Sequence, residues 1–159
     1  MQRAMCCLFV MVMSAQSGVA STQPPLFCVE NDHFLGSIER VSFTAFDMQI
    51  DSRVDTGARR SSLHAKSIQL IEEGDQRFVQ FYAIDDLGHA HKMKEKLRYI
   101  SEITNTSGIS EKRFVIRTFI VLKNKKYSID VNLKDRSNMQ YKFLIGRDLL
   151  KKGGYLVKV

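Results

Sequence analysis

Cysteine is scarce in this chain, which has three cysteines among 159 residues. Two of them, Cys6 and Cys7, lie in an N-terminal segment that we expect to be removed, and only Cys28 then remains. A single cysteine cannot close an intramolecular disulfide, so the folded domain must be held by its core or by a partner chain. Internal repeats and low-complexity tracts are also absent. The roughly 140 residues that remain suffice for one domain with a modest core.

A hydrophobic run long enough to cross a bilayer is absent too. The apolar segment 4–13 has about half the length that a membrane-spanning helix needs. It follows a short, weakly positive start and precedes small residues that end in Gly18-Val19-Ala20. This layout is typical of a secretory signal peptide, so we predict that residues 1–20 are cleaved after Ala20 and that the mature chain has no membrane span. An uncleaved anchor and a buried N-terminal strand are the alternative interpretations.

The motifs of metal-dependent and ATP-dependent proteases are missing as well. The sequence contains no His-Glu-x-x-His and no glycine-rich loop that ends in Lys-Ser or Lys-Thr. His89 and His91 would point to one face of a strand, and His64 could join them, but histidines on an exposed hairpin are more often surface residues. We therefore predict no metal site and no cofactor.

Charge is plentiful and mainly positive, with 24 basic and 17 acidic residues and a net charge of +7. The basic residues are dispersed along the chain and do not form one stripe with interleaved aromatic residues. Such a surface indicates a solvated exterior with some preference for acidic partners, and it does not predict nucleic-acid binding.

Alternating apolar and polar residues recur in short segments, which is typical of β-strands in a small barrel. Residues 21–35, with Pro24-Pro25, are interpreted as a linker or N-terminal extension, and residues 36–159 as the folded domain. A single helical turn is expected at 61–66 and one short helix at 147–152. The fold class is therefore all-β, a small closed or partly closed β-barrel with one short C-terminal helix. Strands are expected at 36–45, 48–54, 68–71, 78–84, 89–96, 99–103, 113–122, 127–133, 141–145 and 155–159.

The motif Asp55-Thr56-Gly57-Ala58 follows one of these strands and occurs once in the chain. Peptide hydrolysis without a metal or a nucleophilic side chain needs two carboxylates about 3 Å apart that share a proton and hold a water. Asp55 is the candidate catalytic residue. We expect the Thr56 hydroxyl to fix the turn across a two-fold axis, Gly57 to allow close backbone approach, and Ala58 to keep the surroundings apolar. One copy of the motif implies that the site needs two chains.

A second motif, Leu144-Ile145-Gly146, lies about ninety residues further along the chain. This apolar strand can pass beneath the aspartate turn, and Gly146 permits the close crossing. Arg147 begins the short helix directly afterwards.

Together these segments resemble the retroviral-type (retropepsin-like) aspartic proteases. They resemble more closely a bacterial retropepsin-like family long labelled ATP-dependent zinc proteases. The resemblance implies an acid-protease barrel, a homodimer with one Asp55 from each chain, a peptide or protein substrate, and a bacterial periplasmic setting. It also implies a flap hairpin, which we place at 103–112 with Ser107 and Gly108 at its tip. The matching stretches are 53–59, 62–65, 107–108, 113–118, 135–139 and 144–150.

One position departs from the retroviral pattern. Retroviral enzymes usually carry an acidic residue directly after the alanine of the motif, whereas this chain has Arg59. We expect an inverted ion pair between Arg59 and Asp148, although an ordinary surface pair is the alternative. Arg59 could favour acidic side chains in a substrate. His64 is expected to pack beside the aspartate loop and orient it, and Arg136 is interpreted as structural.

The sequence therefore predicts an exported aspartic endopeptidase that hydrolyses peptide bonds with a water held between two Asp55 carboxylates. The competing hypothesis is a catalytically silent or latent peptide-binding or assembly module on the same fold.

Overall fold

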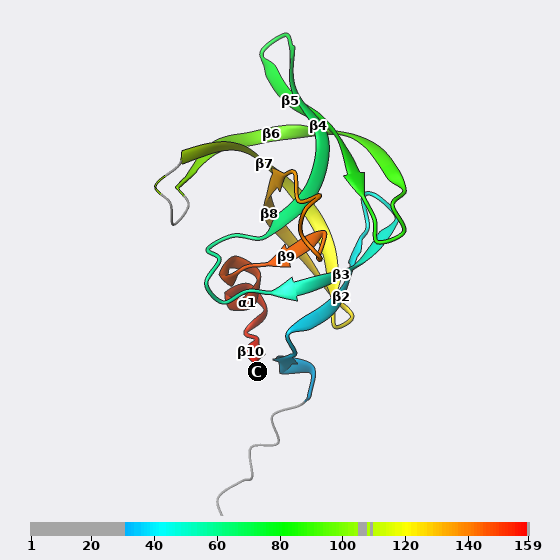
Figure 1. Cartoon of the computed structure of the whole chain (residues 1–159), viewed down its shortest axis with the longest axis vertical. Helices are drawn as coiled ribbons and strands as arrows, with labels where there is room; N and C mark the ends of the chain where they lie inside the picture. The colour runs from blue at the N-terminus through cyan, green and yellow to red at the C-terminus, as the bar shows by residue number, and fades with distance from the viewer. Residues whose placement is uncertain (1–30, 105–107, 109, 159) are drawn as a thin grey trace, which may run out of the picture.

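A computed structural model of the chain describes residues 31–104, 108 and 110–158. Within these residues the chain forms one 8-stranded sheet that curls into a partly closed barrel, a separate 2-stranded sheet, and one short helix (Figure 1). This confirms the predicted all-β class. The expected signal peptide and Ser107 lie outside the described residues.

Consecutive strands form hairpins from β2 to β3 and from β4 through β8, whereas β9 lies between β3 and β4. The sheet order β2-β3-β9-β4-β5-β6-β7-β8 gains two further pairings, β2 with β7 and β4 with β8, and these close most of the ring. The elements are η1 (Asn31–His33), β1 (Phe34–Leu35), β2 (Ile38–Phe43), β3 (Met48–Val54), β4 (Ser62–Glu73), β5 (Gln76–Ile84), β6 (Ala90–Thr104), β7 (Ser110–Leu122), β8 (Lys125–Lys134), β9 (Phe143–Ile145), α1 (Arg147–Gly153) and β10 (Leu156–Val157).

The short strand β9 is central to the architecture because it runs between two strands that lie far from it in the sequence. It pairs in parallel with the end of β3, where Val54 lies opposite Ile145, and antiparallel with the start of β4. The segment that joins β3 to β4, residues 55–61, therefore passes around the end of β9. The predicted aspartate turn lies in this segment.

The core fills the barrel and follows from the period-two alternation of the strands. In β3 the odd and even positions alternate strictly between exposed and buried. Phe43 stacks on Phe46 and meets Phe143 edge-on, so the β2–β3 hairpin and β9 are packed together. The largest fully buried side chains are Phe43, Phe81, Phe143, Leu35, Ile50, Leu63, Ile116, Ile120, Leu122, Leu133, Ile145 and Leu149.

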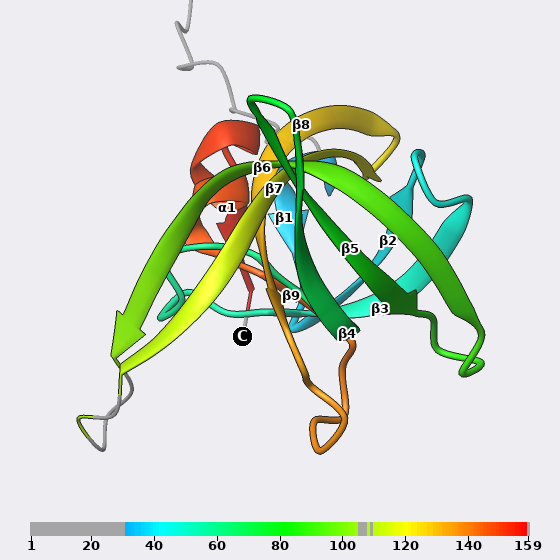
Figure 2. The same cartoon turned by 90° about the horizontal axis from the view of Figure 1, so that it is seen from above.

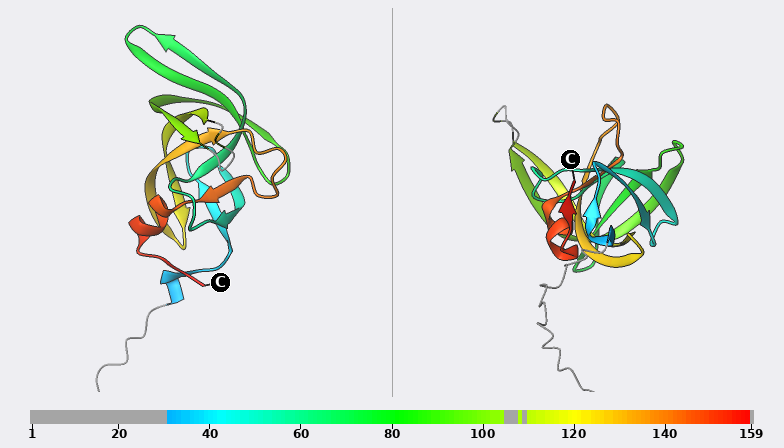
Figure 3. Two further views of the ribbon diagram at one scale, coloured as in Figure 1. Left: turned by 60° about the vertical axis from the view of Figure 1, so that its left-hand side comes forward. Right: turned by 90° about the horizontal axis from the view of Figure 1, so that it is seen from below.

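Several hairpins and loops project from the barrel. The long β4–β5 hairpin rises at the top of Figure 1 and extends well beyond the core in the left view of Figure 3. Seen from above, the β6–β7 hairpin, the loop 135–142 and the β5–β6 turn project to the same side (Figure 2).

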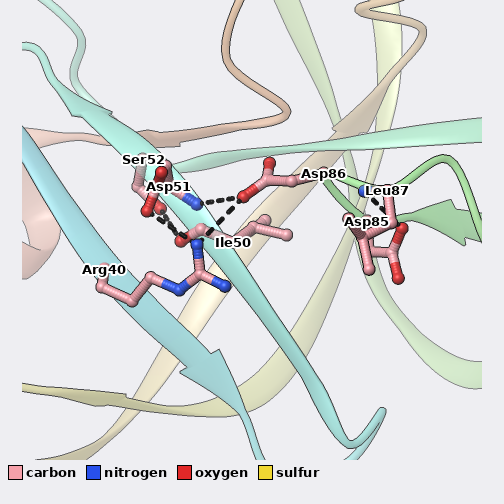
Figure 4. Close-up of polar contacts among 7 residues, drawn as sticks. All are labelled: Arg40, Ile50, Asp51, Ser52, Asp85, Asp86 and Leu87. Atoms are coloured by element: carbon pink, nitrogen blue, oxygen red, sulfur yellow. Dashed lines mark hydrogen bonds and ion pairs between the residues drawn. The ribbon is translucent and has the colours of Figure 1, made fainter.

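Asp86 fastens the β5–β6 turn to the β2–β3 hairpin (Figure 4). Its carboxylate accepts a hydrogen bond from the Asp51 backbone N–H at 2.7 Å and lies 3.5 Å from the Arg40 guanidinium. Arg40 also bonds Asp51 at 2.9 Å. These groups line a cavity of about 520 Å³ that also reaches Gln140 and Tyr141.

The two ends of the domain lie together. Phe34 and Leu35 form β1, which pairs in parallel with β10, and Leu35 is fully buried. The sequence placed both residues in the segment 21–35, interpreted as a linker or N-terminal extension, whereas the structure gives Phe34 and Leu35 a strand. The linker was inferred from polar residues and prolines, and a two-residue strand among them leaves almost no periodic signal.

Two other local predictions differ from the structure. The expected helical turn at 61–66 is the start of β4, where parallel pairing with β8 and antiparallel pairing with β9 override the local pattern. Segments 89–96 and 99–103 form a single strand, β6, with a register shift between Leu97 and Tyr99. No helix in the described ranges has both the length and the apolar character that crossing a membrane requires.

Candidate active site

The aspartate turn follows β3 directly and is closed by its own side chain. The Asp55 carboxylate oxygen Oδ1 accepts hydrogen bonds from the backbone N–H groups of Gly57 at 2.9 Å and Ala58 at 3.1 Å. The Asp55 N–H donates to the Ile145 carbonyl at 2.9 Å, which ties the turn to β9. The side chain is thereby fixed in orientation while it remains half-exposed. Thr56, beside it, is exposed at the surface.

Gly146 permits the close crossing that the sequence predicted. A Cβ atom at this position would lie 2.4 Å from the carbonyl carbon of Arg60 and 2.8 Å from the Ser61 nitrogen. These are backbone atoms that cannot move aside. The next residue, Arg147, donates its N–H to the Ala58 carbonyl at 2.9 Å. The crossing strand and the start of α1 therefore support the turn at both ends, through residue 55 and residue 58.

Asp148 does not form the expected ion pair with Arg59. Its carboxylate instead accepts hydrogen bonds from the backbone N–H and the hydroxyl of Ser61, at 3.1 and 2.9 Å, and from the Leu149 N–H. The Ser61 hydroxyl in turn accepts a bond from the Gly146 N–H at 3.1 Å. Asp148 therefore anchors the end of the 55–61 segment, and Arg59 is left exposed. The inverted-pair prediction was wrong because the backbone at Ser61 satisfies the carboxylate.

Several cavities adjoin the turn, and two of them have Arg136 as a shared lining residue. One, of about 430 Å³, is lined by Asp55, Arg53, Arg136 and residues of the loop 135–142. The other, of about 460 Å³, lies between the 57–62 segment and the β6–β7 hairpin. Arg136 and Leu144 line both cavities, so the two cavities are neighbours beside the catalytic candidate.

His64 lies elsewhere than predicted. Its side chain is buried, and Nδ1 accepts a hydrogen bond from the Arg136 N–H at 2.8 Å. The same nitrogen is 3.7 Å from Asp135. His64 therefore orients the 135–142 loop and not the aspartate turn. His64 follows the aspartate segment closely in the sequence, which suggested a contact between the two. The loop that His64 contacts lies about seventy residues later in the chain, so the sequence gives no sign of this contact.

Burial of His64 makes the protein's stability depend on pH. Desolvation and the nearby Lys142 lower the pKa of His64 below its usual 6.5, with Asp135 partly opposing them. Because the unfolded chain binds this proton at higher pH, His64 costs no stability above about pH 6.5, and stability falls as the pH drops below that value. We expect a slope of up to about 1.4 kcal/mol per pH unit between pH 6.5 and the folded pKa.

Urea unfolding between pH 5 and 7.5 measures this slope. A His64→Gln variant should lose part of the slope, since an amide oxygen can still accept the Arg136 hydrogen bond but cannot be protonated in this range. A slope identical in both proteins would contradict the assignment.

The β6–β7 hairpin occupies the place predicted for the flap. Its strands pair up to Thr104 and Ser110, whose hydroxyls lie 2.9 Å apart. Gly108 has a positive φ of 77°, a conformation that suits glycine at a hairpin tip. Residues 101–104 line the same cavity as Gly57 and Ala58, so the hairpin and the aspartate turn face one space.

His89 and His91 converge on the carboxylate of Asp85 at the β5–β6 turn. His89 Nδ1 and His91 Nε2 lie 3.0 and 3.5 Å from Asp85 Oδ2. Burial acts against ionisation of Asp85, but hydrogen bonds from His89 and His91 outweigh it and lower the pKa of this carboxyl. His64 is not part of this group, so the structure does not bring the three histidines together.

Sequence reasoning missed a polar group that supports the site from β8. The Asn132 side chain donates to the Ser61 carbonyl at 3.0 Å, and its oxygen lies 2.9 Å from the Ser62 hydroxyl and 3.4 Å from Arg113. Asn132 is buried and lines the cavity below the β6–β7 hairpin. The sequence carries no clear signal of this role, because Asn132 continues the alternation of polar and apolar residues along β8.

Known proteins are similar to this chain. The chain matches the RimB-like family, described as "Retropepsin-like aspartic endopeptidase RimB", over residues 34–159. Proteins named "Probable alpha-L-glutamate ligase" are also similar: 33% identity over 73% of this chain in Desulfotalea psychrophila, and 34% over 64% in Parasynechococcus marenigrum. The chain spans 26% and 22% of the length of these two relatives.

A solved structure agrees with the fold. A crystal structure of Lpg0085, a protein of unknown function from Legionella pneumophila, superposes with a TM-score of 0.66 and 26% identity. The match covers 79% of this chain and 92% of the Legionella chain.

A barrel in which a glycine-containing strand crosses beneath an Asp-Thr-Gly turn is the architecture of a single-domain, retropepsin-like protein. Within that class, the match over residues 34–159 shows that the chain belongs to the RimB-like family.

Proposed function

We propose that this protein is an aspartic endopeptidase whose active site forms between two copies of the chain. The observation that carries the proposal is the Asp55 carboxylate, which two backbone N–H groups hold on a turn beside an open cavity. One carboxylate per chain is half of what metal-free peptide hydrolysis needs. The exposed face of the turn, with Thr56, leaves room for a second copy.

The reaction uses the two Asp55 side chains as base and acid. The ionised carboxylate takes a proton from the bound water, whose oxygen attacks the carbonyl carbon of the peptide bond. The protonated carboxyl of the other chain gives its proton to the carbonyl oxygen. The tetrahedral intermediate then collapses: the carboxyl that took the water proton gives it to the amide nitrogen, and the other carboxylate takes back a hydroxyl proton. The C–N bond breaks, and a carboxylic acid and an amine are released.

The substrate that this site suits best is a glutamate-rich peptide. The two cavities beside the turn are lined by five arginines, whereas the only carboxylates among their described lining residues are Asp55 and Glu102. Arginine binds carboxylates through paired N–H donors. The relatives named as probable glutamate ligases carry a similar domain, which supports a link with glutamate-containing chains. The lining arginines are Arg53, Arg59, Arg60, Arg113 and Arg136.

We also propose that residues 1–20 direct export and that the enzyme acts in the bacterial periplasm. The support is the apolar segment 4–13 followed by small residues up to Ala20.

Matched peptides test the proposed activity. Purified protein should cleave a peptide that contains a run of glutamates and should cleave the same peptide with glutamines at least about tenfold more slowly, since each charge-assisted hydrogen bond contributes about 1.5–3 kcal/mol. A pepstatin-like inhibitor should block cleavage, and mass spectrometry identifies the products. Binding of the glutamate peptide with no cleavage at any pH would instead favour a silent peptide-binding module.

A further inference from the structure

Arg136 is held rigidly at the edge of the candidate active site. It lies in the loop 135–142 after β8, and its residue is only 7% exposed. Its backbone N–H donates to His64, and its Nε donates to the Tyr141 carbonyl at 3.2 Å. These contacts fix the backbone and the near side of the guanidinium. The two terminal nitrogens make no hydrogen bond within the described residues and are not among the fully buried polar atoms, so they are free to bind a ligand in the cavities that Arg136 lines.

This buried cation has no carboxylate partner among the described residues. None of the ion pairs within 4.0 Å among the described residues involves Arg136. By contrast, Arg40, Arg113 and Arg117 each pair with a carboxylate at 2.7 to 2.9 Å. Burial lowers the pKa of Arg136, the neighbouring Arg113 adds to this effect, and Asp55 opposes it. A mostly buried charge without a counterion is costly unless water or a ligand compensates for it.

Arg136 lies close to where a substrate's cleaved peptide bond would sit. It is shared by the cavity that contains Asp55 and by the cavity under the β6–β7 hairpin. A peptide that occupies both cavities would therefore lie against Arg136. By contrast, Arg59 is exposed, and Arg60 lies over the Tyr99 ring at 5.1 Å. Exposed cations discriminate weakly between charged and neutral ligands because water screens them.

We propose that Arg136 is the specificity-determining residue of the site and binds the carboxylate of an acidic substrate side chain next to the cleaved bond. The proposal rests on the proposed peptidase function. A glutamate carboxylate would supply the missing counterion and would accept two parallel N–H bonds from the terminal nitrogens. A glutamine would leave the charge unpaired, so the site would reject it.

Arg136→Met tests the proposal with the matched glutamate and glutamine peptides. We expect kcat/KM for the glutamate peptide to fall about 10- to 100-fold, while kcat/KM for the glutamine peptide stays within about threefold. Arg136→Lys keeps the positive charge but loses the paired N–H donors of the guanidinium, so its kcat/KM for the glutamate peptide should lie between those of the wild type and Arg136→Met. Arg117→Met is the control, because Arg117 is an exposed arginine on β7 that pairs with Asp130; it should keep the preference of the wild type.

Three results would overturn the role of Arg136. Equal losses for both peptides would indicate a purely structural residue, and equal cleavage of both by the wild type would remove the preference to be explained. If Arg136→Met does not fold, an unchanged glutamate preference in Arg136→Lys decides against the role. The Kd of each peptide, measured by calorimetry in an Asp55→Asn background, separates this outcome from failure of the peptidase proposal. Selective loss of glutamate-peptide binding there supports Arg136 even if the wild type cleaves nothing.

Discussion

Asp55→Asn should abolish cleavage of the glutamate peptide, with kcat/KM reduced by about 10³- to 10⁴-fold, the contribution expected of a general acid–base pair. In a homodimer one substitution removes both carboxylates at once. The amide oxygen can still accept the hydrogen bonds from Gly57 and Ala58 that close the turn. Fold and self-association should therefore be unchanged, as circular dichroism and sedimentation would measure.

Asp75→Asn is the matched control for this loss. Asp75 lies exposed in the turn of the β4–β5 hairpin, far along the chain from the crossing strand. The Asp75→Asn variant should cleave the glutamate peptide at the wild-type rate. Equal activity in the wild type and Asp55→Asn would end the peptidase assignment, whereas loss of activity together with loss of the fold would mean that the variant reports on structure only.

Gly146→Ala should be the most destabilising small substitution near the site. The added Cβ would lie 2.4 and 2.7 Å from the Arg60 carbonyl carbon and oxygen, distances that force one backbone segment away from the other. Overpacking of this kind costs about 1–3 kcal/mol, and the displaced Ser61 bonds add to it. We expect a loss of about 3 kcal/mol in the free energy of unfolding, measured with urea, and a parallel loss of activity because the aspartate turn shifts.

Gly36→Ala is a suitable control for the backbone effect. The nearest atoms to a Cβ at Gly36 are 3.8 and 3.9 Å away, in ordinary van der Waals contact. This variant should match the wild type or gain up to about 1 kcal/mol, because alanine reduces the freedom of the unfolded chain. If Gly146→Ala were as stable as Gly36→Ala, the strand crossing would not be as close as described.

The parts of the site that sequence could predict are those with a local signal. Asp55 and Gly57 form a turn whose hydrogen bonds span three residues, and the strand before it alternates apolar and polar residues throughout. Gly146 followed by a short helix was also readable, because a glycine between an apolar strand and a helix indicates close approach. The barrel class follows from many short alternating segments.

The parts that sequence could not predict depend on which distant segments meet. From the sequence, Asp148 could have paired with any nearby cation. It accepts a hydrogen bond from the Ser61 backbone because the crossing strand places the two residues side by side. His64 reaches Arg136 across 72 positions, so nothing near either residue signals the contact. The start of β4 was taken for a helical turn because its pairing partners, β8 and β9, both lie more than sixty residues later.

Mixing subunits tests the shared active site most directly. Wild-type protein at fixed concentration is equilibrated with increasing amounts of Asp55→Asn, and cleavage is followed. If each site needs one Asp55 from each chain, activity should fall to about a half at equal amounts and to about a quarter at a threefold excess, as random exchange into mixed dimers requires. Activity that stays constant while sedimentation shows mixed dimers would contradict the account, because a single chain would then carry the whole catalytic apparatus.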